Sequence, residues 1–219
     1  MSKNLLFLMY STLLYTAILG SESCLAAEFS VEIIDQNGDP VSHAVVVNPV
    51  DVVTVGETPI SGPPAVMDQV DKRFVPFVLA VKKGRPVVFP NSDNIRHHVY
   101  SFSEAKRFEI KLYANKPKAP VTFETEGLVV LGCNIHDSMI GYIFVSQWSD
   151  FVVSDGQGIA SFSDQAILPE EILVWHPWSS DAANVNKIKI NQWPDNGKFR
   201  LTLTITKPKK KSRFKRYSR

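Results

Sequence analysis

Cysteine is scarce in this sequence: the chain of 219 residues holds two, Cys24 and Cys133. Cys24 lies in an N-terminal segment that we expect to be removed, and Cys133 then has no disulfide partner in the chain. An unpaired thiol is a liability in an oxidising compartment unless something holds it. A bound metal ion would do so.

The first 27 residues have the pattern of a secretory signal. An apolar run over residues 5–20 is followed by small residues, and the run is short for a membrane span. We predict a signal peptide over residues 1–27, cleaved after Ala26 or Ala27, and export to a bacterial periplasm. Two alternatives stay open, namely cleavage at a lipidated Cys24 and an uncleaved membrane anchor.

Amphipathic helical periodicity is missing after residue 27, which argues against a helical fold. Proline (14 residues) outnumbers glycine (11), and short runs rich in Val, Ile, Phe and Thr alternate with turn residues. The sequence therefore predicts an all-β fold. Strands are expected at residues 28–34, 41–47, 74–81, 86–91, 108–112, 121–124, 128–131, 142–145, 153–162 (two strands and a turn), 172–177 and 199–206.

Acidic residues are absent from the C-terminal segment 207–219, which holds eight basic residues. The formal net charge of the whole chain is +2, so the remainder carries −6 (+2 − 8). We predict a solvated basic tail, and weak contact with anionic lipid or an acidic partner is the alternative. Export argues against nucleic acid as a target.

A thiol, an imidazole and a thioether follow one another with two residues between each pair, in Cys133, His136 and Met139. They lie between the expected strands 128–131 and 142–145, so a short loop can turn all three side chains toward one point. With a second histidine from elsewhere, these are the ligands of a blue-copper site. The alternative is a buried cysteine and a methionine that only fill the core.

The segment from Phe74 to Val145 resembles a cupredoxin, the Greek-key blue-copper sandwich of plastocyanin, azurin and amicyanin. The resemblance lies in the motifs V-x-x-G-x-x-V-x-F-x-N over residues 81–91, H-x-V from His97 and C-x2-H-x2-M from Cys133. It implies one type 1 copper ion held by four ligands: His97, Cys133, His136 and Met139. The whole chain also resembles exported proteobacterial proteins labelled methylamine utilisation proteins.

The choice between the adjacent His97 and His98 stays open, because His98 stands where cupredoxins usually have an asparagine that ties the ligand loops together. Strand alternation favours His97. If Val99 points into the sandwich, His97 shares its side and His98 faces outward. Asn91 or Asn134 could supply the missing tie.

The flanks of this segment resemble the two halves of a small transthyretin-like domain of the carboxypeptidase-regulatory kind. Residues 28–60 carry D-x-x-G-x-P-V-x-x-A-V-V, and residues 148–206 carry D-G-x-G-x-x-x-F followed by W-H-P. We therefore predict a cupredoxin domain over residues 64–147, inserted into the split domain. His43 is interpreted as a surface histidine, and Trp175 and His176 as core or surface residues; none of the three is expected to be a ligand.

The resemblance implies an electron carrier, not an enzyme, that passes single electrons between redox proteins docking near His136. An apolar docking rim is expected from four residues: Pro90, Ile135, Met139 and Ile140. A copper carrier or chaperone and an interaction module with a structural metal are the alternatives. A copper oxidase or nitrite reductase needs further histidines, and the five present include no H-x-H pair. No small-molecule substrate is expected.

Overall fold

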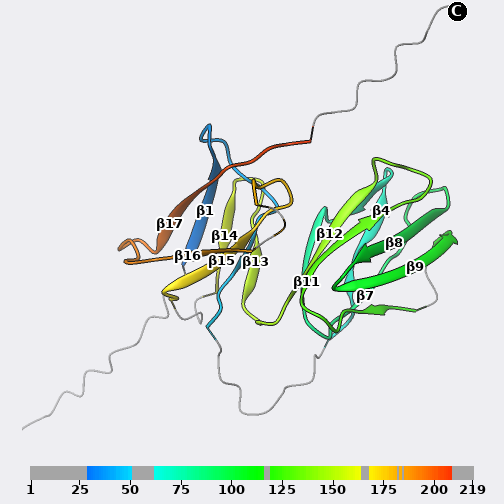
Figure 1. Ribbon diagram of the computed structural model, residues 1–219, viewed down its shortest axis with the longest axis horizontal. Helices are drawn as coiled ribbons and strands as arrows, with labels where there is room; N and C mark the ends of the chain where they lie inside the picture. The colour runs from blue at the N-terminus through cyan, green and yellow to red at the C-terminus, as the bar shows by residue number, and fades with distance from the viewer. Residues whose placement is uncertain are drawn as a thin grey trace, which may run out of the picture.

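The computed structural model describes residues 29–50, 62–115, 119–163, 168–181, 183 and 185–208. Within these ranges the chain forms β-strands and no α-helix, so the predicted all-β class is confirmed. None of the described segments is a helix long and apolar enough to span a membrane. The strands form two groups that lie side by side (Figure 1). We name them the central lobe (β3 to β12) and the flanking lobe (β1, β2 and β13 to β17).

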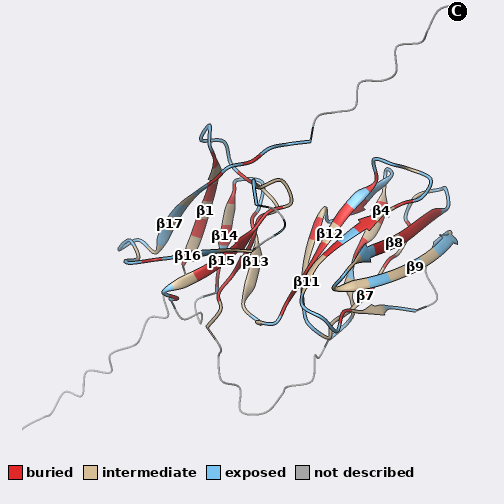
Figure 2. Ribbon diagram, in the orientation of Figure 1, coloured by how far each residue is buried: buried red, intermediate tan, exposed pale blue. Residues whose placement is uncertain are grey.

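The central lobe is a sandwich of a five-stranded sheet, β6-β12-β11-β8-β9, and a three-stranded sheet, β10-β7-β3, with the hairpin β4-β5 beside them. Its strands are β3 (Ala65–Val66), β4 (Asp68–Val70), β5 (Arg73–Val75), β6 (Val78–Lys82), β7 (Pro86–Val88), β8 (His97–Ser103), β9 (Lys106–Tyr113), β10 (Val121–Thr122), β11 (Gly127–Gly132) and β12 (Ile140–Ser146). Side chains from both sheets, such as Val87 and Ile143, meet in one buried core. Figure 2 shows buried residues along β8 and β12 of this lobe.

The sequence of β12 divides its side chains between two surroundings. Ile143 and Val145 lie in the core of the central lobe, whereas Tyr142 and Phe144, which alternate with them, face the flanking lobe. A strand that is covered on both faces can be apolar throughout, instead of alternating between apolar and polar residues. This explains the unbroken apolar run at the end of β12.

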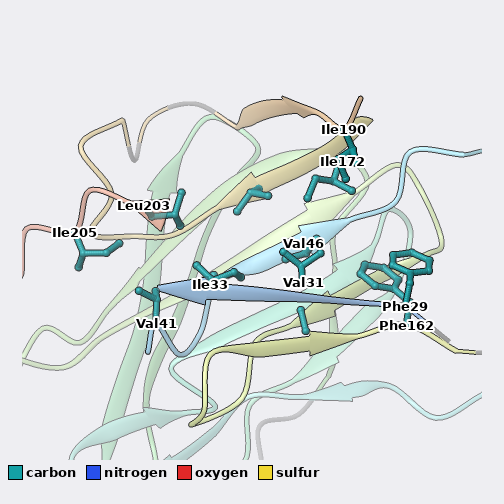
Figure 3. Close-up of a cluster of buried hydrophobic side chains, with 13 residues drawn as sticks. Phe29, Val31, Ile33, Val41, Val46, Phe162, Ile172, Ile190, Leu203 and Ile205 are labelled. Carbon is teal, nitrogen blue, oxygen red and sulfur yellow. The ribbon is translucent and has the colours of Figure 1, made fainter. Parts of the chain in front are cut away.

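The flanking lobe contains two sheets, with strand orders β14-β1-β17 and β13-β2-β15-β16. Its strands are β1 (Ser30–Asp35), β2 (Val45–Val47), β13 (Phe151–Val153), β14 (Ile159–Ser161), β15 (Glu171–Trp175), β16 (Asn186–Lys189) and β17 (Lys198–Leu203). Their apolar side chains fill a separate core (Figure 3). Phe29 stacks on Phe162 there, with 4.5 Å between the ring centroids.

A third apolar cluster joins the two lobes. Val45, Val47 and Trp175 of the flanking lobe meet Val78 and Phe144 of the central lobe, and all five are buried. Burying one large apolar side chain contributes about 1.5–3 kcal/mol. Because several such side chains take part, the flanking lobe is a fixed cover over the outer face of β6 and β12.

The strand pairing of the flanking lobe joins the two ends of the described chain. β1 pairs with β14 and β17, and β2 pairs with β13 and β15, so the start of the described chain pairs with strands that follow residue 150. The transthyretin-like halves at 28–60 and 148–206 and the inserted domain at 64–147 stay predictions. The predicted signal peptide, residues 51–61 and tail residues 209–219 lie outside the described residues.

One expected strand is broken. The sequence predicts a single strand over residues 74–81, but β5 ends at Val75 and β6 begins at Val78. Pro76 lies between them and has no N–H to donate to a neighbouring strand. β5 pairs with β4 and β6 pairs with β12, so the break carries the chain from the hairpin into the five-stranded sheet.

Candidate metal centre

Three predicted ligands converge at one end of the five-stranded sheet. His97 begins β8, Cys133 follows β11, and His136 lies in the loop between β11 and β12. The Sγ atom of Cys133 lies 3.8 Å from Nδ1 of His97 and 3.9 Å from Nδ1 of His136. One ligand atom from each residue falls within 4.8 Å of the others. This separation suits three donors that share one ion.

The loop that carries Cys133 and His136 is held by the pairing of its two flanking strands. Gly132 pairs with Ile140 at the base of the loop, and the N–H of Met139 donates to the carbonyl of His136 at 2.9 Å. Cys133 is 3% exposed and Met139 1% exposed, and both belong to the central core. The predicted fourth ligand, Met139, is thus buried in the same core as Cys133.

Two glycines at the ends of this loop allow close packing against its backbone. A Cβ atom on Gly132 would come within 2.7 Å of the ring of Tyr100, and one on Gly141 within 2.7 Å of Cβ of Phe74. Contacts this short require the neighbouring side chain to move. Tyr100 and Phe74 therefore pack closely against the two ends of the loop that carries Cys133.

Asp93 orients His97. Its Oδ2 atom lies 2.6 Å from Nε2 of His97, whose side chain is fully buried. An ionised carboxylate only accepts hydrogen bonds, so Nε2 carries the proton and Nδ1 is left with its lone pair toward Cys133. This is the arrangement in which a carboxylate fixes the ring of a metal-binding histidine.

Asp93 is itself held by the turn between β4 and β5. The backbone N–H groups of Asp71 and Lys72 donate to its two carboxylate oxygens at 2.7 and 2.9 Å. Burial alone would raise the pKa of Asp93, but hydrogen bonds from Lys72, His97 and Asp71 outweigh it and lower the pKa below its usual value. Sequence reasoning missed Asp93, and the signal that could have found it is a carboxylate four residues before a candidate ligand.

The structure brings His97, and not His98, to the cluster. Nε2 of His98 lies 2.8 Å from Oε1 of Glu109 on β9, away from Cys133. His97 and Val99 are both fully buried, as strand alternation predicts, although the pairing of β8 with β9 is irregular between these two residues. His98 is 8% exposed, more buried than an outward-facing residue would be, because it packs beside Tyr100.

Asn91 ties the segment before His97 to the end of β9, which is a different tie from the expected one between the two ligand loops. Its side-chain amide donates to the carbonyls of Ile95 at 2.8 Å and Tyr113 at 3.0 Å, and its Oδ1 accepts the N–H of Asp93 at 3.1 Å. The segment before His97 is thereby fastened to the end of β9. Asn134, the other candidate for this role, is exposed.

The predicted docking rim is partly wrong. Ile135 is 49% exposed and Ile140 42% exposed, as a docking surface requires, but Met139 is buried and cannot belong to it. The alternating direction of side chains turns Met139 inward and Ile140 outward at the start of β12. Of the flank residues, Trp175 and His176 are buried and His43 is half-buried.

The donor set fits a soft metal ion. A thiolate and two imidazole nitrogens, with a thioether beside them, are soft and borderline ligands, and copper is the ion that this combination selects. Among the described residues, His97, Cys133 and His136 are the single such cluster of three or more His, Cys, Asp or Glu. The residues present therefore fit the predicted copper ion.

No protein-family model and no curated protein matches the chain. Over part of its length it is similar to solved structures. A copper-containing nitrite reductase from Thermus scotoductus SA-01 is 26% identical, with a TM-score of 0.38, over 44% of this chain and 25% of that chain. An oxidised amicyanin mutant is 19% identical (TM-score 0.36) over 40% of this chain and 86% of its own. A purple cupredoxin from Nitrosopumilus maritimus is 21% identical (TM-score 0.33) over 37% and 96%.

The matched region spans only a quarter of the nitrite reductase chain. All three TM-scores lie below 0.5, so a functional conclusion has to come from the side chains of this protein. The resemblance to methylamine utilisation proteins stays a prediction.

Proposed function

We propose that this protein is a type 1 copper protein that carries single electrons between redox partners and is not itself an enzyme. The observation that supports it is the convergence of one ligand atom each from His97, Cys133 and His136 within 4.8 Å of one another, with His97 and Cys133 buried. Met139 is the proposed fourth, weak ligand.

A bound copper ion would supply a one-electron couple, since both of its oxidation states accept two imidazoles and a thiolate. The protein would fix the positions of the ligand atoms and exclude water from them. His97 is fixed by Asp93, Cys133 is enclosed by the core, and both are shielded from water. Little reorganisation is then required when the charge changes.

His136 is the proposed point of electron entry and exit. It is half-buried, unlike His97 and Cys133, and the exposed Ile135 lies next to it in the loop. A small apolar surface around a half-buried ligand suits weak, short-lived contact with another redox protein. We place these partners at the loop end of the sheet and, with the predicted signal peptide, in the periplasm.

Burial argues against a copper-delivery role. A delivery protein must hand over its ion, which requires exposed or exchangeable ligands. Here His97 and Cys133 are 0% and 3% exposed; His97 begins β8, and Cys133 follows β11 directly. Opening the cluster would disturb the central core, so release should be slow.

A visible and electron paramagnetic resonance spectrum of the copper-loaded protein tests the proposal. We expect an intense sulfur-to-copper charge-transfer band that disappears in Cys133→Ser, because the hydroxyl is not a soft thiolate. The matched control is His98→Ala, which removes a buried imidazole outside the cluster and should keep the band. A band that survives in Cys133→Ser would refute the site.

A further inference from the structure

A cleft lies between the two lobes and reaches the proposed metal loop. Its volume is about 650 Å³, and its lining includes Ser138 and Ile140, the two neighbours of Met139. Cavities of roughly 300–1,000 Å³ at the junction of two domains commonly hold small organic molecules. The cleft was not among the features predicted from the sequence.

Aromatic side chains form much of the cleft wall. Phe77 of the central lobe lies edge-on to His43 of the flanking lobe, with 5.6 Å between ring centroids, and 5.4 Å from the ring of Trp178. His176 meets Trp178 at 5.6 Å. Rings at these separations offer flat faces and edges to a planar guest.

His43 presents unused hydrogen-bonding capacity to this cleft. Within the described parts of the chain, neither of its ring nitrogens has a hydrogen-bond partner. Burial lowers its pKa, so at neutral pH the ring is uncharged and offers one donor and one acceptor. His176, by contrast, is occupied: its Nε2 lies 3.2 Å from the carbonyl of Ser42, and its Nδ1 accepts the N–H of Trp178 at 3.1 Å.

The charged residues that line the cleft favour an anion. Arg73 and Lys207 contribute two positive charges, and Asp35 contributes one negative charge. The Asp35 carboxylate accepts the N–H groups of Asn37 and Asp39 with its Oδ1 at 2.8 and 3.0 Å. Lys207 also interacts with this carboxylate, so the cleft keeps a net charge of +1 (+2 − 1). Arg73 makes only an exposed 3.5 Å contact with Asp71, which contributes little and leaves the guanidinium available.

We propose that this cleft binds a planar aromatic carboxylate that carries a hydrogen-bonding ring substituent. The ring lies among Phe77, His43 and Trp178, the carboxylate faces Arg73 and Lys207, and the ring substituent bonds to the imidazole of His43. This site does not depend on the proposed copper ion, because none of these residues belongs to the His97–Cys133–His136 cluster.

Isothermal titration calorimetry on the full chain tests the proposal, with 4-hydroxybenzoate as the probe. Three further compounds each remove one feature: benzoate lacks the hydroxyl, trans-4-hydroxycyclohexanecarboxylate lacks the flat ring, and 4-hydroxybenzyl alcohol lacks the charge. We expect saturable one-to-one binding of 4-hydroxybenzoate and weaker binding of each analogue. The titration is made on metal-free and copper-loaded protein, so its outcome is separate from that of the copper proposal.

Two variants assign the contacts. His43→Asn retains a residue that tolerates the left-handed backbone at φ +67° and should weaken binding about tenfold, as for one lost hydrogen bond. Arg73→Gln, on an exposed side chain, should weaken it about fivefold. Arg107→Gln, an exposed cation on β9 at the opposite edge of the five-stranded sheet from β6, is the matched control and should bind as the unmodified protein does.

Three results would each overturn the proposal. The first is the absence of saturable heat with 4-hydroxybenzoate, and the second is equal binding of trans-4-hydroxycyclohexanecarboxylate. The third is unchanged affinity in both His43→Asn and Arg73→Gln.

Discussion

Replacing Asp93 by asparagine should weaken copper binding and raise the reduction potential of the proposed site. Asp93 accepts hydrogen bonds from His97 Nε2 at 2.6 Å and from two backbone N–H groups, those of Asp71 and Lys72. Asparagine has one acceptor oxygen in place of two, and its NH₂ group cannot accept the Nε2 proton. The variant therefore loses a negative charge and at least one of the three hydrogen bonds by which Asp93 is held beside His97.

The expected loss of copper affinity can be estimated from other residues that hydrogen-bond to a metal-binding histidine. Loss of a residue that orients a metal-binding histidine typically lowers metal affinity about 10- to 100-fold. The negative charge favours the more highly charged Cu(II) state, so most of the loss should fall on that state. At about 59 mV for each tenfold change, the potential should rise by roughly 60–120 mV.

Copper competition with a chelator and a potentiometric titration measure the two quantities. Asp71→Asn is the matched control, since it removes one negative charge from the turn that holds Asp93, and its side chain is 79% exposed. Its φ of +52° is one that asparagine tolerates, and its backbone N–H still reaches Asp93. An unchanged potential in Asp93→Asn, or an equal rise in both variants, would refute the positioning role of Asp93.

Three further predictions follow from the site and its surroundings. His97→Ala should lose the visible copper band while His98→Ala keeps it; the reverse result would transfer the ligand role to His98. The copper-loaded protein should show reversible one-electron voltammetry and should retain its copper in the presence of a moderate competing chelator. Rapid, complete transfer of copper to the chelator in either oxidation state would favour a delivery role. The third concerns His176, whose pKa is lowered to about 4, mainly by burial. In the unfolded chain this histidine has a pKa near 6.5, so as the pH falls the unfolded state binds the proton before the folded state does. The metal-free protein should therefore lose about 3 kcal/mol of its free energy of unfolding between about pH 6.5 and about pH 4. Urea denaturation at several pH values measures this loss, and His176→Gln should flatten it.

The sequence alone was sufficient for the all-β class and for the loop that carries Cys133, His136 and Met139. Both depend on local relations: short apolar runs bounded by turns, and three side chains spaced along one hairpin. Alternation from Val99 also favoured His97, whose Nδ1 faces Cys133, but it placed His98 outward, whereas the structure buries His98.

The remaining features of the site depend on contacts between distant segments, which no local pattern records. Asp93 receives its hydrogen bonds from Asp71 and Lys72, more than twenty positions earlier, and only the packing of the β4-β5 hairpin brings them together. The burial of His98 depends on Tyr100 and on Glu109 of the next strand. Met139 was expected on the docking rim, but the register of β12 turns it into the core.

The cleft between the two lobes is the clearest example of a feature that depends on contacts between distant segments. Its walls come from residues as far apart in the chain as Asp35 and Lys207, and they meet because β1 and β2 pair with strands beyond residue 150. Periodicity and spacing act over a few residues, so they determined the strands and the metal loop. The long-range pairing of those strands determined where His43, Arg73 and Trp178 lie, and only the tertiary structure could decide it.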